Sequence, residues 1–147
     1  MDDAQRRLAD ELEIRNLIAR LAHMADTGDL DAEYLPLFTD DAEWVFPGGA
    51  DPAAGKATVK GHAAIRADRV QRRGSGFQGP GTGTRHLNTT LAVRVDGSDT
   101  AEADSYWMFI GDTASGDPKV RGVGQYHDTF ERTPSGWKLA RRQIIPG

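Results

Sequence analysis

The sequence predicts a single α+β domain, because helical periodicity dominates its first part and strand alternation dominates its second part. Between residues 4 and 25, apolar side chains recur every three or four positions. Between residues 84 and 95, polar and apolar residues alternate up to the turn-forming pair Asp96-Gly97. A chain of 147 residues can bury a sizeable core, so we expect one domain over residues 1–147.

The composition argues against several functional classes. The chain has no cysteine, which excludes disulfides, thiolate metal sites and cysteine nucleophiles. Its net charge of -4, with acids and bases interspersed, offers no broad basic surface, so nucleic acid is not an expected partner. The N-terminus is polar, and no segment approaches the roughly 18 apolar residues of a membrane span. We therefore expect a cytoplasmic protein without a membrane partner.

The first part of the chain is predicted to be mainly helical. Gly28 ends the first helix and Asp29 caps the second, while Asp40-Asp41 precedes the first strand. The expected order is a helix at about 4–25, a short helix at about 30–37, a strand at 42–46, a loop at 47–55, a short strand at 57–60 and a helix at about 62–72.

The second part is predicted to form an antiparallel meander of four strands, at about 84–95, 101–110, 120–132 and 137–145. The glycine-rich connection before the meander, Gly74 to Gly83, contains the spacing G-x-G-x-x-G. A helix precedes this spacing and a strand follows it, which reverses the order found in dinucleotide-binding proteins. We therefore expect no nucleotide cofactor.

His86 is the strongest candidate for a catalytic residue. Because side chains alternate along a strand, it shares a face with Asn88, Thr90 and Arg94. An imidazole that a rigid strand holds among polar groups can act as a general base, because its ordinary pKa of about 6.5 is close to neutrality. The other histidines are expected outside the site: His23, His62 and His127.

Asp26 is a candidate partner for this histidine. It lies at the edge of the apolar stripe of the first helix and near the C-terminal end of that helix. A negative charge is unfavourable there, because it meets the negative end of the helix dipole. Asp26 either belongs to the turn Asp26-Thr27-Gly28-Asp29 or is kept for a functional reason, and spacing alone favours neither.

Arg141 is a candidate for binding an anionic group. Strand alternation puts it on one face with Trp137, Leu139 and Ile145. An arginine that projects among apolar side chains usually meets a carboxylate or an anionic ligand.

Five short motifs follow one another along the chain: Ile14-Arg15-Asn16-Leu17, Asp26-Thr27-Gly28-Asp29, Leu37-Phe38-Thr39-Asp40-Asp41-Ala42-Glu43-Trp44, Thr84-Arg85-His86 and Gly136-Trp137-Lys138-Leu139-Ala140-Arg141-Arg142. In this order and spacing, the sequence resembles the SnoaL-like branch of the nuclear transport factor 2-like superfamily. The resemblance implies a conical α+β barrel with three N-terminal helices and a strongly curved, mostly antiparallel sheet. It also implies a deep apolar pocket and a homodimer.

The resemblance extends to scytalone dehydratase, bile-acid dehydratase and hexachlorocyclohexane dehydrochlorinase, and it implies that Asp26 and His86 act as a pair within hydrogen-bond distance. In those enzymes the pair abstracts a carbon-bound proton. Dehydratases of this branch often carry a tyrosine where this chain has Leu21, so another donor must polarise the substrate carbonyl. The candidates for carbonyl polarisation are Tyr106 and Tyr126, and the candidates for substrate binding are Tyr106, Tyr126, Arg141 and Trp44.

We therefore expect a lyase or isomerase of the dehydratase, isomerase or cyclase type that acts on a small apolar substrate, aromatic or steroid-like. His86 would be the base and Asp26 would orient it, without a metal or a cofactor. Two alternatives use the same fold. One is a non-catalytic protein that binds a small molecule, and the other is a structural subunit resembling the small subunit of ring-hydroxylating dioxygenases.

The strand face opposite His86 leads to an expectation about assembly. It presents Leu87, Leu91, Val93 and Val95, which would form an exposed apolar patch if His86 faces a pocket. Either a second copy covers this patch, or a β-bulge breaks the alternation. Because the resemblance implies paired sheets, we expect a homodimer with a symmetric interface built around this strand and the strand that holds His127. The competing outcome is that the apolar face lines the core and His86 points outward.

Overall fold

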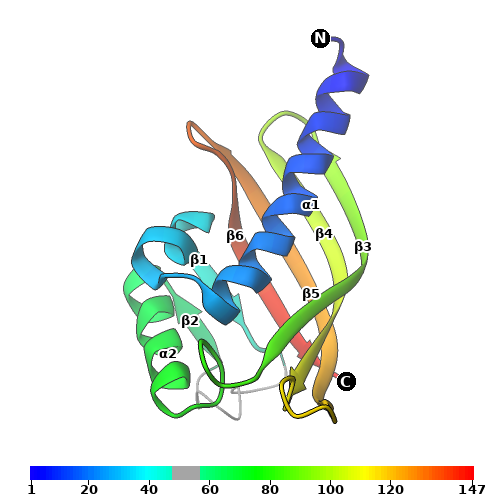
Figure 1. Cartoon of the computed structure of the whole chain (residues 1–147). Helices are drawn as coiled ribbons and strands as arrows, with labels where there is room; N and C mark the ends of the chain where they lie inside the picture. The colour runs from blue at the N-terminus through cyan, green and yellow to red at the C-terminus, as the bar shows by residue number, and fades with distance from the viewer. Residues whose placement is uncertain (48–56) are drawn as a thin grey trace.

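Helix α1 lies across one face of a curved six-stranded sheet (Figure 1). The computed structural model describes residues 1–47 and 57–147, and the predicted loop at 47–55 lies outside these ranges except for Pro47. The helical segments are α1 (Asp3–Thr27), η1 (Leu30–Tyr34), η2 (Leu35–Leu37) and α2 (His62–Gly74). The strands are β1 (Phe38–Val45), β2 (Thr58–Lys60), β3 (Arg85–Asp96), β4 (Thr100–Gly111), β5 (Lys119–Thr133) and β6 (Gly136–Pro146).

The sheet confirms the predicted α+β class and the antiparallel meander. Its strand order is β2-β1-β6-β5-β4-β3, and every neighbouring pair is antiparallel except β1 and β6. The sheet has two free edges, β2 and β3, so the barrel that the resemblance implied is not closed. The three predicted helices are also not all N-terminal to the sheet, because α2 follows β1 and β2. The predicted second helix is a π turn followed by a 3-10 turn.

Helix α1 begins and ends where its side chains satisfy the backbone. Asp2 and Gln5 form a capping box, in which each side chain accepts the other residue's backbone N–H. Gly28 follows the last turn, and a Cβ atom there would lie 2.8 Å from the backbone Cα of Met24, so a larger residue would have to shift the helix end. The buried stripe of the helix faces the sheet and consists of Ile14, Leu17, Ile18, Leu21 and Ala25.

Strand β3 changes its side-chain alternation at a bulge around Thr90. Before the bulge, His86 pairs with Phe109 of β4, and after it Val93 pairs with Ala103. Phe109 and Ala103 lie on the same face of β4, since they are an even number of residues apart. Thr90 itself has φ 55°, which is the left-handed conformation that an inserted residue can adopt.

The bulge corrects the predicted separation of His86 from the apolar residues of β3. Leu91, Val93 and Val95 pack against the core on the same side as His86, and Leu87 remains on the outer face. The prediction that all four apolar residues lie opposite His86 is therefore wrong. Of the alternatives considered, the broken alternation is the one that holds.

A second bulge, around Ala140 in β6, corrects the predicted direction of Arg141. Leu139 pairs with Phe130 of β5, but the next paired residue is Arg141 rather than Ala140. Arg141 consequently lies on the outer face, where its Nε donates to Glu43 at 3.0 Å. The arginine that projects inward is Arg142.

The core lies between α1, η1 and the inner face of the sheet. Tyr34, Phe38 and Trp44 pack edge to face in sequence, with ring centroids 5.0 and 6.2 Å apart. All three side chains are buried. Within the described ranges, no helix is long and apolar enough to cross a membrane.

Candidate active site

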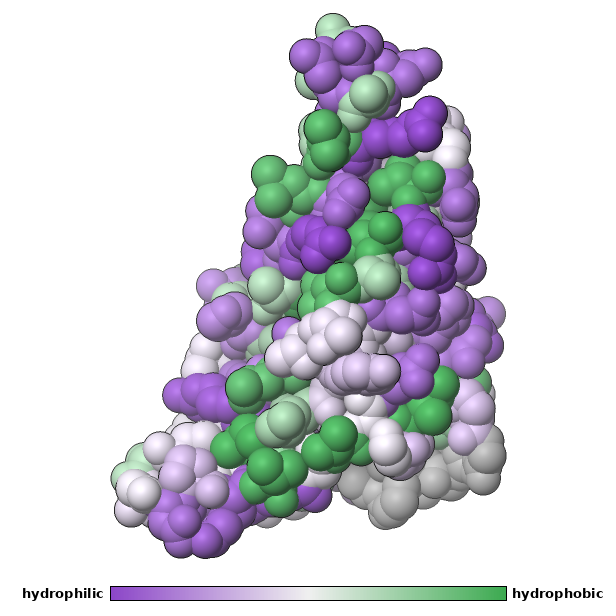
Figure 2. Space-filling view, turned by 90° about the vertical axis from the view of Figure 1, so that its right-hand side faces the viewer, coloured by the Kyte–Doolittle hydropathy of each residue, from purple (hydrophilic) through white to green (hydrophobic). Residues whose placement is uncertain are grey.

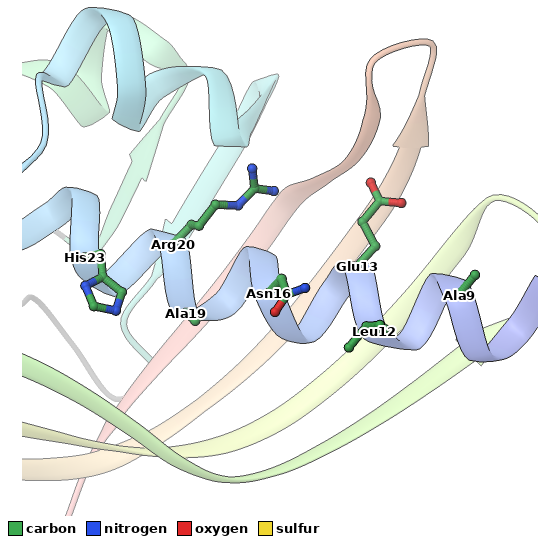
Figure 3. Close-up of a pocket in the computed structure, with 7 residues that line it drawn as sticks. All are labelled: Ala9, Leu12, Glu13, Asn16, Ala19, Arg20 and His23. Carbon is green, nitrogen blue, oxygen red and sulfur yellow. The ribbon is translucent and has the colours of Figure 1, made fainter.

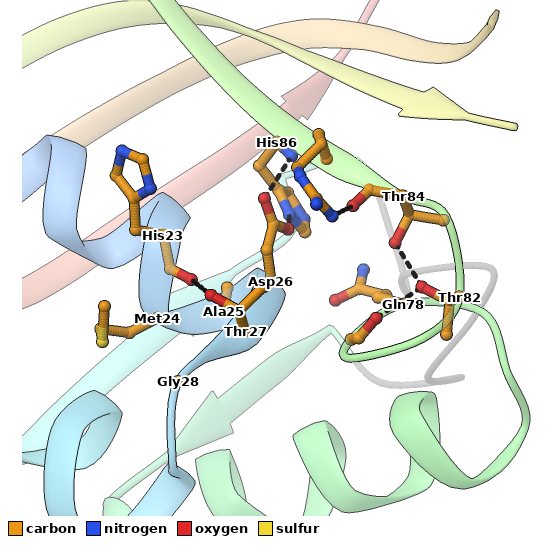
Figure 4. Close-up of polar contacts among 12 residues, drawn as sticks. His23, Met24, Ala25, Asp26, Thr27, Gly28, Gln78, Thr82, Thr84 and His86 are labelled. Carbon is orange, nitrogen blue, oxygen red and sulfur yellow. Dashed lines mark hydrogen bonds and ion pairs between the residues drawn. The ribbon is translucent and has the colours of Figure 1, made fainter. Parts of the chain in front are cut away.

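Asp26 and His86 form a hydrogen-bonded pair at the end of α1 (Figure 4). Nδ1 of His86 lies 2.6 Å from Oδ1 of Asp26, and the backbone N–H of His86 donates to Oδ2 at 3.0 Å. The side chain of His86 is 10% exposed and that of Asp26 is 5% exposed. The helix delivers the carboxylate and β3 delivers the imidazole, so the structure brings these two predicted residues together.

This hydrogen bond determines which ring nitrogen of His86 is available as a base. A carboxylate without a proton only accepts hydrogen bonds, so Nδ1 carries the ring hydrogen and donates a hydrogen bond to Asp26. Nε2 keeps its lone pair and has no hydrogen-bond partner among the described residues. Burial lowers the pKa of His86 below its ordinary value, although the hydrogen bond to Asp26 opposes this effect. The imidazole is therefore neutral at neutral pH.

Arg73 of α2 compensates for the acidic side chain at the end of α1. No basic residue occurs in the last turn of α1, but Nη2 of Arg73 donates to the carbonyl oxygens of Met24, Ala25 and Gly28 at 3.1, 3.3 and 2.8 Å. A cation at this position offsets the negative end of the helix dipole. Arg73 thereby holds in place the turn that carries Asp26.

Aromatic side chains line the inner face beside the pair. The ring of Phe109 lies 4.9 Å from that of His86, and Phe77 lies 5.3 Å from Phe109. Further along the same face, Trp107 stacks on Tyr126 with a centroid distance of 5.9 Å. These contacts make the surroundings of the imidazole largely apolar.

Glycines in β5 allow the indole of Trp107 to lie close to the sheet. A Cβ atom at Gly124 would be 2.5 Å from the ring, and one at Gly122 would be 3.1 Å from it. Any larger residue at Gly124 would push the indole away from the strand. Gly122 and Gly124 thus determine the position of the Trp107 ring, which lines one side of the inner face.

Arg142 and Asp128 form a second buried pair of charges on the inner face. Nε and Nη2 of Arg142 donate to the two carboxylate oxygens of Asp128, each at 2.8 Å. The guanidinium lies 3.9 Å from the ring centre of Tyr126. Burial alone would lower the pKa of Arg142, but the charge of Asp128 raises it, so the guanidinium keeps its charge.

Comparison with known proteins assigns this arrangement to a family. The model of the SnoaL-like domain matches residues 6–143. The chain belongs to the SnoaL-like family. No curated protein matches the sequence.

Solved structures of similar fold extend the assignment of the SnoaL-like domain. An NTF2-like protein with a cystatin-like fold from Novosphingobium aromaticivorans is 33% identical, with 97% of this chain and 85% of that chain covered and a TM-score of 0.77. A protein from the same organism, proposed to be an aromatic ring hydroxylase, is 27% identical over 95% and 90% of the two chains, with a TM-score of 0.70. Another, proposed to be a scytalone dehydratase, is 20% identical over 98% and 88%, with a TM-score of 0.69.

The predicted substrate-binding residues of the SnoaL-like domain divide between the two faces of the sheet. Trp44 and Tyr126 are buried on the inner face, which also carries His86. Tyr106 and Arg141 lie on the outer face, and Tyr106 is 54% exposed. The structure therefore does not bring Tyr106 and Arg141 together with His86. Simple alternation places Tyr106 outside, whereas the bulge in β6 displaces Arg141.

Several inner-face residues were not predicted from the sequence. Arg69 is the clearest case, because Ile65, Asp68 and Arg72 share its side of α2 at helical spacing. Ile65 and Asp68 are buried, so this spacing was a usable signal. Tyr34 was missed because a π turn does not show the helical period of 3.6 residues.

The structure also has an open hollow of about 650 Å³ on the outward side of α1, away from the candidate site (Figure 3). Its lining residues all come from this one helix: Ala9, Leu12, Glu13, Asn16, Ala19, Arg20 and His23. In residues 1–47 and 57–147, no group of three or more histidine or acidic side chains is placed to hold a metal ion.

Proposed function

We propose that this protein is a lyase or isomerase that removes a carbon-bound proton from a small apolar or aromatic substrate. The observation that carries the proposal is the buried hydrogen bond from Nδ1 of His86 to Asp26, which leaves Nε2 as a free base. The similar structures proposed to be an aromatic ring hydroxylase and a scytalone dehydratase are consistent with small aromatic substrates.

In the proposed reaction, Nε2 of His86 takes a proton from the carbon next to a carbonyl group. The electron pair of the broken C–H bond moves toward the carbonyl oxygen, and an enolate forms. Asp26 keeps the ring oriented and stabilises the imidazolium. The imidazolium then gives its proton to a leaving hydroxyl group, which eliminates water, or to another carbon, which moves the double bond.

Tyr126 is the proposed hydrogen-bond donor to the carbonyl oxygen. Its side chain is buried on the inner face, and its hydroxyl has no hydrogen-bond partner among the described residues. Burial raises the pKa of Tyr126, so the hydroxyl keeps its proton at neutral pH. Tyr126 can thus take the part of the tyrosine that is absent at Leu21.

Three further polar atoms near this face favour a substrate of which one part is polar and uncharged. Oδ1 of Asn88, Oγ of Ser105 and Nε1 of Trp107 are buried and have no hydrogen-bond partner in the structure. Leaving such a group unpaired costs about 1–3 kcal/mol. Asn88 and Trp107 are paired in the register, and Asn88 lies two residues from His86. A substrate with carbonyl and hydroxyl oxygens would satisfy them.

We also propose that the protein forms a homodimer through the outer face of β3, β4 and β5. Leu87, Tyr106, Val120 and Val123 are each more than 40% exposed on these strands. Figure 2 shows the side of the molecule at β3, where apolar groups gather in the lower part of the view. Contiguous apolar patches of this kind are uncommon on soluble monomers.

Proton exchange tests the reaction. We would incubate the protein in D₂O with cyclic aromatic ketones, with and without a β-hydroxyl group, and follow deuterium incorporation and water loss by NMR. His86→Gln should reduce the rate by roughly two to four orders of magnitude, the usual contribution of a positioned base. His127→Gln is the matched control, because His127 also has an aspartate partner but lies on the outer face.

The outcomes separate the proposed enzyme from its rivals. Equal exchange rates in the wild type and in His86→Gln would refute the base. Tight ligand binding without any exchange in the wild type would favour the small-molecule-binding alternative. Isolation only as part of a complex with a large oxygenase subunit would favour the structural alternative.

A further inference from the structure

The four arginines of α2 differ in the groups that they contact. Arg66 and Arg72 each form an ion pair with an aspartate. Arg73 donates to carbonyl oxygens at the end of α1. Arg69 has neither a carboxylate nor a backbone partner in the part of the chain that the structure describes. Its positive charge therefore has no directly paired counter-charge among the described residues.

Arg69 is nevertheless held firmly against the inner face. Its Nε donates to the hydroxyl of Tyr34 at 3.1 Å, and its Nη1 donates to Oε1 of Gln78. The guanidinium lies 4.8 Å from the ring centre of Trp44 and 5.1 Å from that of Tyr34. Tyr34, Gln78 and Trp44 are all buried. Two aromatic faces and two hydrogen bonds thus fix the orientation of the guanidinium.

The groups around Arg69 still have hydrogens to donate. The hydroxyl of Tyr34 accepts from Arg69, so its own proton is free for another acceptor. The oxygen of Gln78 faces Arg69, which leaves its NH₂ group as a donor. Nη2 of Arg69 makes no hydrogen bond to a described residue. Three neighbouring side chains therefore present N–H or O–H groups.

The carboxylates of the inner face are already engaged by other partners. Asp26 accepts two hydrogen bonds from His86, and Asp128 is paired with both arms of Arg142. Neither is therefore available to neutralise Arg69. A neutral ligand would leave the charge of Arg69 uncompensated, whereas a carboxylate would pair with the guanidinium through strong, charge-assisted hydrogen bonds.

We propose that Arg69, Tyr34 and Gln78 bind a carboxylate group of the substrate, which makes the substrate an apolar or aromatic carboxylic acid. The inference rests on the proposed function in one respect, which is that the bound molecule is the one that reacts. The site itself would hold a carboxylate without any turnover. The carboxylate lies against α2, and the rest of the molecule extends along the aromatic side chains toward His86. Arg69 is thus a specificity-determining residue.

Calorimetric titration with two matched ligands tests this site. The ligands are 2-naphthoate and its neutral analogue 2-naphthamide, which have nearly the same shape. The wild type should bind the carboxylate at least about tenfold more tightly, since charge-assisted hydrogen bonds are the stronger kind. Arg69→Gln should remove most of this preference. Arg66→Gln, which alters an exposed ion pair on the same helix, should keep it.

Further variants keep the result decisive. Arg69→Lys retains the charge but not the planar fork, so it should keep part of the preference. This variant serves as the test if Arg69→Gln does not fold. Equal affinity of the wild type for the two ligands would overturn the proposal, as would an unchanged preference in Arg69→Gln. His86→Gln should preserve the preference. If the wild type prefers the carboxylate but catalyses no proton exchange, the proposed reaction is refuted and the carboxylate site stands. If the wild type catalyses proton exchange but shows no preference, the carboxylate site is refuted and the reaction stands.

Discussion

Two histidine–aspartate pairs with the same contact distance lie on opposite faces of the sheet. The inner pair joins His86 to Asp26, and the outer pair joins His127 to Asp104, with 2.6 Å between Nδ1 and Oδ1 in each. The side chains of the inner pair are 10% and 5% exposed, and those of the outer pair are 30% and 38% exposed. The hydrogen bond alone therefore does not distinguish a base from a surface contact.

The surroundings of the two rings make the difference. Nε2 of His127 lies 3.8 Å from a carboxylate oxygen of Glu102, and Asp104 also accepts from Arg94 at 3.0 Å. The outer pair is thus part of a surface network of charges. The ring of the inner histidine lies 4.9 Å from that of Phe109, and its Nε2 has no hydrogen-bond partner among the described residues. An imidazole becomes a candidate base when a carboxylate orients one nitrogen and the other nitrogen is left without a protein partner.

The largest expected effect comes from changing the aspartate of each pair. Asp26→Asn should lower the rate of proton exchange by roughly two to four orders of magnitude, because the amide does not stabilise the imidazolium. Asp104→Asn should leave the rate within about threefold of the wild type, since surface ion pairs contribute little. NMR detection of deuterium incorporation measures both. Similar losses in the two variants would erase the distinction between the pairs.

A smaller effect is expected from the proposed dimer, which would cover the exposed apolar patch of the outer face but not the inner face. Val123→Lys introduces a charge on the exposed apolar patch and should weaken dimerisation by on the order of 100-fold, because a buried unpaired charge is costly. Sedimentation velocity measures the change, and the variant should stay folded. Leu91 packs against the core, so a charge at Leu91 would disturb folding instead. A monomeric wild type would contradict the dimer.

The smallest expected effect is the pH dependence of stability that the buried imidazole of the inner pair confers. Burial lowers the pKa of folded His86 below that of the unfolded chain, so the unfolded state binds the proton first on acidification. The stability that depends on neutral His86 is fully present above about pH 6.5 and is lost as the pH falls through the lowered folded pKa.

Urea unfolding at a series of pH values measures this effect. The fall in midpoint on acidification should be shallower in His86→Gln than in the wild type, because glutamine does not titrate. Parallel curves for the two proteins would show that burial does not perturb His86.

The sequence predicted the order of helices and strands well because each element has a regular period. It placed every strand of the meander within one or two residues of its observed end. Asp26 and His86 were found because each is unusual where it stands, an acid at a helix C-terminus and a histidine on an alternating strand. Local pattern was sufficient to single out His86, whereas the role of Asp26 and its pairing with His86 came from the resemblance to the SnoaL-like branch.

Alternation failed where one residue is inserted in a strand. Thr90 and Ala140 resemble ordinary strand residues, so nothing in their identity marks a bulge. The register with the neighbouring strand creates each bulge, and that register is a property of the whole sheet. The predicted direction of Arg141 and the predicted face of Leu91 were both lost in this way.

The bulge at Thr90 makes the length of β3 more informative than its composition. Deleting one residue there would restore simple alternation and leave Leu91 and every later side chain on its present face, because Leu91 would then stand alone opposite Ser105 and Val93 would still pair with Ala103. Homologous sequences should therefore be aligned with the gap at this position rather than at the nearby hairpin. A designer who grafts this strand onto a sheet that does not form the bulge must also remove the extra residue, because Leu91, Val93 and Val95 would otherwise turn to the face opposite His86.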